Sequence, residues 1–114
     1  MDQGFGKRYR LLKTEEFSSV FALRRLSSRA AVQVWQRPNG LPHPRLGLVV
    51  AKKTAKRANR RNYMKRALRE WFRCNRHRLA ANDIVVRVRL PFDASGCAEV
   101  WRQLEQTVQR KHHD

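Results

Sequence analysis

The stretch that most constrains the fold is residues 58–73, ANRRNYMKRALREWFR, which has no glycine or proline and many residues that favour helices. We therefore predict that it forms the main helix. At about 100° per residue, its apolar and basic side chains lie in two opposite sectors. The apolar sector contains Met64, Ala67, Leu68, Trp71 and Phe72. The opposite sector contains Asn62, Arg66, Arg69 and Arg73, with Lys65 at its border. One side of this helix must be buried, which leaves a cationic ridge on the other.

Basic residues are concentrated around this helix, from residue 52 to residue 78. This stretch has twelve basic residues and a single acid, Glu70, a local net charge of +11. The twelve are Lys52, Lys53, Lys56, Arg57, Arg60, Arg61, Lys65, Arg66, Arg69, Arg73, Arg76 and Arg78. Charge runs on helices are often only solvated faces, but the alternating acids of such faces are missing here. We therefore favour a polyanion as partner, because counterion release would turn the repulsion into affinity.

The composition of the whole chain supports a nucleic acid as this partner. Its 114 residues include 26 Lys and Arg against 9 Asp and Glu, a net charge of +17, and Arg outnumbers Lys 19 to 7. Arginine binds phosphate bidentately and stacks on bases, which favours nucleic acid over an anionic membrane. With 41% hydrophobic residues the chain should fold. Its length predicts one domain spanning residues 1–114, with flexible ends at about 1–10 and 110–114.

The rest of the chain predicts two further helices and three strands. Thr14 can cap a short helix in which Phe17, Val20 and Phe21 share one face. Residues 30–36 and 46–51 predict two strands, residues 82–90 a half-buried third strand, and residues 98–108 an amphipathic helix. The order αββαβα predicts an α+β sandwich, a small sheet packed with helices. If the second and third strands are parallel neighbours, they form a split βαβ unit around the basic helix, right-handed by default.

We predict no catalytic or metal site in the protein itself. The nine acids are scattered, without the paired carboxylates of a nuclease metal site. Cys74 and His77 form half of a zinc site at most, and Cys97 stands alone. Two cysteines are too few for a disulfide scaffold, so in a reducing compartment we expect free thiols. No run approaches the ~20 apolar residues of a membrane span, and the first residues lack the apolar middle of a signal peptide. We therefore expect a cytoplasmic protein without a membrane partner.

The segment AKKTAKRANRRNYMKRALREWFR resembles the signature of the bacterial ribonuclease P protein component, in its proteobacterial form. The matching pairs are Lys52-Lys53, Arg61-Asn62, Lys65-Arg66 and Arg69-Glu70. RLLKTEEFSSVF, HPRLGLVVAKK and NDIVVRVR resemble the family's first helix, the strand before the motif and a later strand. The resemblance covers nearly the whole chain, from about Phe5 to the last helix. Tyr63 departs from it, because the family usually has an arginine there; a tyrosine could stack or donate a hydrogen bond instead.

The resemblance implies a subunit that assists a catalytic RNA in removing the 5′ leader from precursor tRNA. It implies a left-handed crossover around the motif helix, and a cleft between the sheet and the first helix that holds the single-stranded leader. The RNA performs the cleavage and carries the Mg²⁺, so the protein itself binds no cofactor. We predict no obligate protein partner. The expected RNA-binding residues are Lys52, Lys53, Lys56, Arg57, Arg60, Arg61, Asn62, Lys65, Arg66, Arg69 and Arg73.

Residues for the leader cleft follow from the way proteins hold single-stranded RNA, on aromatic side chains beside a positive groove. The candidates are Phe17 and Phe21, Trp35 or its neighbour Val34, and Arg87 and Arg89. Phenylalanines four residues apart fit a core equally well.

Three other classes of protein stay open. A ribosomal or general RNA-binding protein fits the charge equally well. A helix-turn-helix DNA-binding protein is disfavoured because the motif helix follows a strand. A self-contained ribonuclease is disfavoured by the missing acid/base pair.

Overall fold

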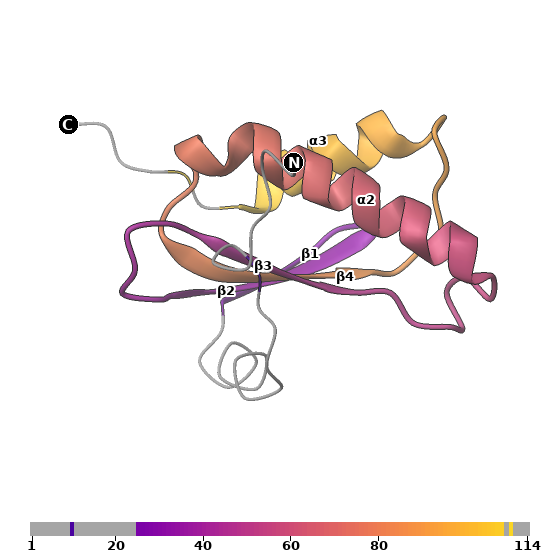
Figure 1. The fold of residues 1–114 in the computed structure, drawn as a ribbon, viewed down its shortest axis with the longest axis horizontal. Coiled ribbons are helices and arrows are strands. Elements are labelled where there is room, and N and C mark those ends of the chain that lie inside the picture. The colour runs from indigo at the N-terminus through magenta and orange to yellow at the C-terminus, as the bar shows by residue number, and fades with distance from the viewer. Residues whose placement is uncertain (1–9, 11–24, 109, 111–114) are drawn as a thin grey trace.

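A computed structural model describes residues 10, 25–108 and 110, which form a four-stranded sheet with two helices on one face (Figure 1). In chain order the elements are β1 (Arg25–Ser28), β2 (Val32–Pro38), β3 (Arg45–Val49), α2 (Ala58–Asn75), the 3-10 helix η2 (Arg76–Arg78), β4 (Asn82–Val88) and α3 (Cys97–Thr107). The strand order is β1-β2-β4-β3. The predicted α+β class is confirmed. The predicted first helix, with Phe17 and Phe21, lies outside the described residues, as do most of the two ends expected to be flexible.

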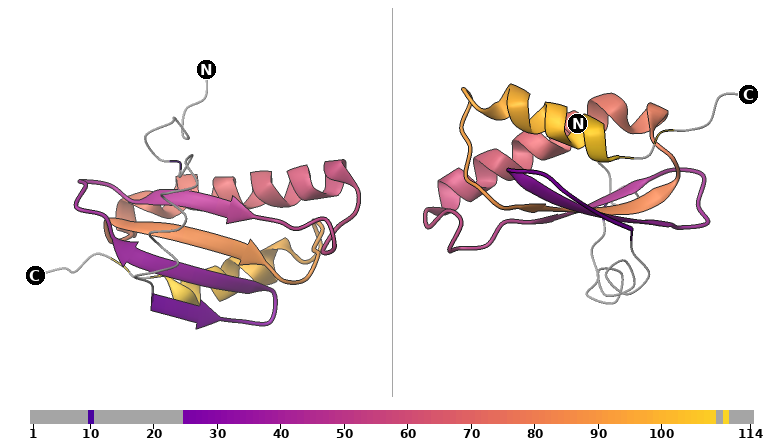
Figure 2. Two further views of the ribbon diagram at one scale, coloured as in Figure 1. Left: turned by 90° about the horizontal axis from the view of Figure 1, so that it is seen from below. Right: turned by 180° about the vertical axis from the view of Figure 1, so that it is seen from behind.

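The core lies between the sheet and the two helices, which cover the same face (Figure 2). α2 buries the apolar sector predicted for it, and Trp71 and Phe72 are 1% and 0% exposed. Two hydrogen bonds join α3 to β2 and to the residue just before it. The backbone N–H of Ala31 donates to the side-chain oxygen of Gln103 over 2.8 Å, and the Gln36 amide donates to the carbonyl of Thr107, also over 2.8 Å. No described helix has the length and apolar character needed to cross a membrane.

The basic helix α2 connects two parallel, directly paired strands, β3 and β4. Leu46 lies opposite Ile84 in their register. The predicted parallel pairing around the motif helix is therefore confirmed. A buried carboxylate secures one end of this pair: Asp83 accepts hydrogen bonds from Arg45 over 2.8 and 2.7 Å and from Asn39 over 3.0 Å. Such bidentate, charge-assisted contacts fix geometry as well as adding energy.

Two features of the sheet differ from the sequence prediction. β1 pairs antiparallel with β2 although its sequence, RLSS, has little strand character, so partner pairing outweighs local propensity there. β4 is not half-buried as predicted: it lies between β2 and β3, and Val85, which shares one face of the strand with Arg87 and Arg89, is 0% exposed. In the register Val85 lies between Trp35 of β2 and Gly47 of β3.

Candidate nucleic-acid interface

The exposed side of α2 is the cationic ridge that its sequence predicts. Asn62, Arg66 and Arg73 are exposed, while Lys65 and Arg69 are half-buried at the margins. The charge of the Arg69 guanidinium is disfavoured, since burial and then the charge of Arg10 lower its pKa. The ridge therefore lies on the side of α2 opposite its buried apolar residues.

The first turn of α2 lacks the acidic residues and side-chain cap that commonly stabilise a helix start. Arg57 occupies the N-cap position, its side chain makes no capping hydrogen bond, and no acid follows in the first turn. Cations at the positive end of the helix dipole are unfavourable. Exposed backbone N–H groups and arginines together at a helix start suit an anion.

Two arginines of α2, Arg61 and Arg73, already use part of the guanidinium to bind a neighbouring group. Nη1 of Arg61 donates to the carbonyls of Ala55 and Lys56, both over 2.8 Å, and so holds the β3–α2 connection against the helix. Arg73 donates to the Glu70 carboxylate, with Nε and Oε1 3.0 Å apart. These hydrogen bonds lower the pKa of Glu70. Arg57 at the beginning of α2 and Arg66 in its middle are exposed, so they offer their charge to a partner.

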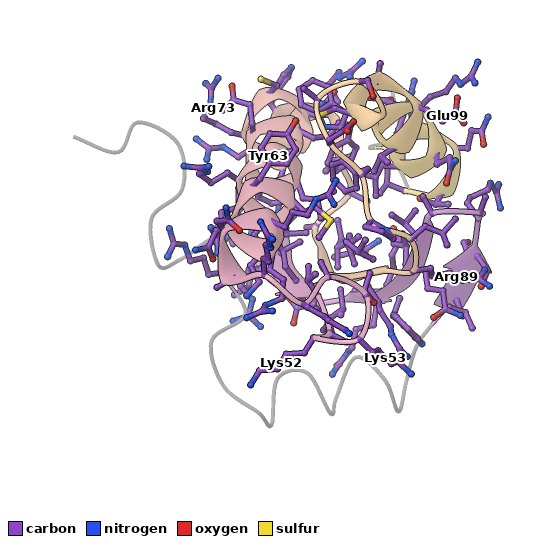
Figure 3. The ribbon with its side chains drawn as sticks, turned by 90° about the vertical axis from the view of Figure 1, so that its right-hand side faces the viewer. Lys52, Lys53, Tyr63, Arg73, Arg89 and Glu99 are labelled. Carbon is purple, nitrogen blue, oxygen red and sulfur yellow. The ribbon has the colours of Figure 1, made fainter. Side chains whose placement is uncertain are left out.

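A cation-lined hollow of about 240 Å³ lies beside the start of the motif region. Its lining residues are Gln33, Lys53, Thr54, Arg87, Val88 and Arg89. Figure 3 looks onto this end of the molecule, where Lys52 and Lys53 project from the β3–α2 connection and Arg89 extends from the end of β4. The sequence predicts that Lys53 belongs to the RNA-binding motif and that the two arginines contact the leader; the fold brings all three together. Arg89 is held in place by donating to the carbonyl of Arg29 over 3.0 Å.

Val34 is a correction to the predicted leader-binding set. Its side chain is 0% exposed and belongs to the core beneath the helices, where it lies opposite Val86 in the register. Side chains alternate along a strand, so Trp35 points to the other face of the sheet. Trp35 is half-buried there, opposite Leu26 on β1 and Val85 on β4.

Tyr63, where the resemblance predicts an arginine, lies on α2 and packs against the segment that precedes α3. Its ring meets the ring of Phe92 edge to face, with centroids 6.2 Å apart and an interplanar angle of 66°. Burial, followed by the neighbouring Cys97, raises the pKa of the phenol. Tyr63 is therefore a neutral aromatic wall rather than a charged contact.

A second hollow, of about 200 Å³, opens beside Tyr63. It is lined by Asn59, Arg60, Tyr63, Phe92, Asp93 and Ala94. Of these lining residues, only Arg60 belongs to the predicted RNA-binding set. No periodic pattern in the sequence indicates that residues 92–94 approach the first turns of α2. Two hydrogen bonds from Ser95 fix the orientation of the Asp93 carboxylate. Its Oδ1 accepts from the Ser95 hydroxyl over 2.6 Å and from the Ser95 backbone N–H over 3.0 Å. These bonds lower the pKa of Asp93, which keeps the carboxylate charged.

Metal ligands do not gather within the part of the chain that the structure describes: no three His, Cys, Asp or Glu side chains converge there. Cys74 is exposed and Cys97 is half-buried, and both are free thiols.

Comparison with known protein sequences identifies the family of this chain. The family model described as Ribonuclease P matches residues 5–112. The chain belongs to this family. The chain is 55% identical to the ribonuclease P protein component of Chromobacterium violaceum over 101 residues, which cover 89% of this chain and 84% of the relative. It is 47% identical to that of Azoarcus sp. over 109 residues, covering 96% and 91%.

Solved structures of the same family share the fold. The RNase P protein of Staphylococcus aureus superposes with a TM-score of 0.77 at 30% identity, covering 86% of this chain and 90% of that one. The RNase P protein of Thermotoga maritima gives a TM-score of 0.73 at 30% identity, covering 91% and 98%. Ribonuclease P is an endoribonuclease of tRNA processing, and membership of this family implies that the chain associates with ribonuclease P RNA.

Proposed function

We propose that this chain binds the catalytic RNA of ribonuclease P through α2 and the β3–α2 connection. The observation that carries the proposal is the cluster of exposed cations at the start of α2, where Arg57 and Arg60 are exposed and no acid lies in the first turn. RNA phosphates would neutralise these groups and release counterions. The RNA-binding set is Lys52, Lys53, Lys56, Arg57, Arg60, Arg61, Asn62, Lys65, Arg66, Arg69 and Arg73.

The same proposal assigns the 5′ leader of precursor tRNA to the hollow between β2, β4 and the β3–α2 connection. Lys53, Arg87 and Arg89 offer three cations around one hollow of about 240 Å³. Trp35, on the sheet face turned away from α2 and α3, would offer an aromatic surface to an unpaired base. Phe17 and Phe21 keep this role as a prediction from the family resemblance.

Cleavage, in this proposal, belongs to the RNA subunit, which also binds the Mg²⁺. The protein contributes affinity and position for the substrate, acts in the cytoplasm and needs no further protein partner. A lane containing only protein, rigorously freed of RNA, should leave precursor tRNA intact.

Competition between RNAs tests the proposed partner. The affinity of the protein is measured at one salt concentration for the cognate ribonuclease P RNA and for an unrelated structured RNA of equal length. We expect clear preference for the cognate RNA. Equal affinity would instead support a general RNA-binding protein, because charge alone does not discriminate between sequences.

A further inference from the structure

The hollow beside Tyr63 has the walls of a binding site for a planar aromatic group. Tyr63 and Phe92 form an edge-to-face pair, and Phe92 is only 7% exposed, so its ring is fixed by the core behind it. At about 200 Å³ the hollow is smaller than the ~300–1,000 Å³ of pockets for drug-sized ligands. A single planar ring system suits such a space better than a whole nucleotide.

The polar groups around the hollow distinguish a base from a phosphate. Asn59 and Asp93 line it, and the Asp93 carboxylate accepts hydrogen bonds, as the amino and imino groups of a nucleobase require. The same carboxylate repels a phosphate. Arg60 also lines the hollow, and a guanidinium can stack on a base or hold the phosphate that follows it.

We propose that this hollow accepts one unstacked nucleobase of a bound RNA, between the Tyr63–Phe92 pair and Arg60. The inference rests on the proposed function, because an RNA must first be held along α2. Arg57, one turn before Arg60, lies at the start of the helix where backbone phosphates would be attracted. Tyr63 thus serves as a wall against which the base is recognised. The base comes either from ribonuclease P RNA or from precursor tRNA.

The decisive variant fills the hollow without removing a core contact. Ala94 is exposed at its rim, so Ala94→Phe should occupy the space meant for the base. The matched control is Ala98→Phe, on an exposed position of α3 that does not line the hollow. A second pair, Tyr63→Ala and Tyr63→Phe, tests the wall itself, and circular dichroism checks that each variant folds.

Affinity and its salt dependence are measured for ribonuclease P RNA and then for precursor tRNA added to the RNA–protein complex. Stacking of one base on an aromatic side chain makes a loss of about tenfold the expected effect of Ala94→Phe and Tyr63→Ala. The slope of log affinity against log salt should not change, because no phosphate contact is lost. Tyr63→Phe and Ala98→Phe should bind like the wild type.

Footprinting with dimethyl sulfate and carbodiimide, which modify the pairing edges of bases, identifies the RNA that supplies the base. We expect one base, in one of the two RNAs, to be protected by the wild type and exposed by Ala94→Phe. Unchanged affinity and footprint in Ala94→Phe would overturn the inference, as would a loss accompanied by a shallower salt slope, which indicates a phosphate contact. Failure of the wild type to prefer ribonuclease P RNA would be a different result, since it contradicts the proposed function itself.

Discussion

The indole N–H of Trp71 on α2 donates a hydrogen bond to the carboxylate of Glu105 on α3, with Nε1 and Oε1 3.3 Å apart. Arg110 donates to the other oxygen of the same carboxylate over 2.7 Å, and Arg78 lies 3.4 Å from the first. Glu105 therefore links α2, α3 and the chain that follows each of them. Because Trp71 is also 1% exposed, one side chain both fills the core and orients the basic helix.

Trp71→Ala should destabilise the fold by about 3–5 kcal/mol, because it leaves a large cavity and removes the donor to Glu105. Urea unfolding followed by circular dichroism measures the change. Trp71→Phe is the matched control: it keeps most of the apolar volume and should cost clearly less. A Trp71→Ala variant with wild-type stability and weak RNA binding would place this residue in the interface rather than in the core.

Arg66→Ala should weaken binding to ribonuclease P RNA and reduce the slope of log affinity against log salt by about 1, the effect of one lost phosphate contact. Arg102→Ala is the charge-matched control, since Arg102 is also exposed but lies on α3 beside Glu99. Its slope should equal that of the wild type. If the wild type, Arg66→Ala and Arg102→Ala had equal slopes, Arg66 would be a solvated side chain without a phosphate contact.

Arg87→Ala should weaken the binding of precursor tRNA to the RNA–protein complex by about fivefold, which corresponds to roughly 1 kcal/mol. The physical reason is the loss of one of three cations around the hollow that Lys53 and Arg89 also line. The measurement compares a precursor with its leader and mature tRNA without one. An equal loss of affinity for both substrates would contradict the assignment of the leader to this hollow.

Asp93 should titrate below its usual pKa of 3.8, mainly because the Ser95 hydroxyl donates to its ionised form. A lowered pKa in the folded state stabilises the fold above pH 3.8, and this contribution is lost as the pH falls through the lowered value. Carboxyl-carbon NMR titration measures the pKa directly. Ser95→Ala should move it back toward 3.8, whereas an unchanged pKa in that variant would assign the shift to other groups.

Periodicity identified the core side of α2 because a long helix repeats its pattern over several turns. Met64, Leu68 and Trp71 are buried as that pattern predicts. The same pattern does not distinguish Val34 from Trp35, since alternation shows only that two neighbours face opposite ways, and the packing of α2 and α3 decides which face of the sheet is covered. The register with β4 buries Val34 against Val86.

The two hollows depend on segments that are distant in the sequence, which explains why they could be predicted only in part. Lys53 and Arg87 were both chosen for their charge, but their approach follows from the parallel pairing of β3 with β4. The hollow beside Tyr63 needs Phe92 and Asp93, which follow β4 and carry no local pattern. Their position is set by the return of the chain from the sheet to α3.

The central claim is that the protein assists a catalytic RNA, and 5′ processing of precursor tRNA at low Mg²⁺ tests it most directly. Three reactions are compared: the cognate ribonuclease P RNA alone, the protein alone, and both together. We predict cleavage at the mature 5′ end that is strongly stimulated only when RNA and protein are combined. Cleavage by RNA-free protein, or no stimulation of the RNA by the protein, would contradict the account.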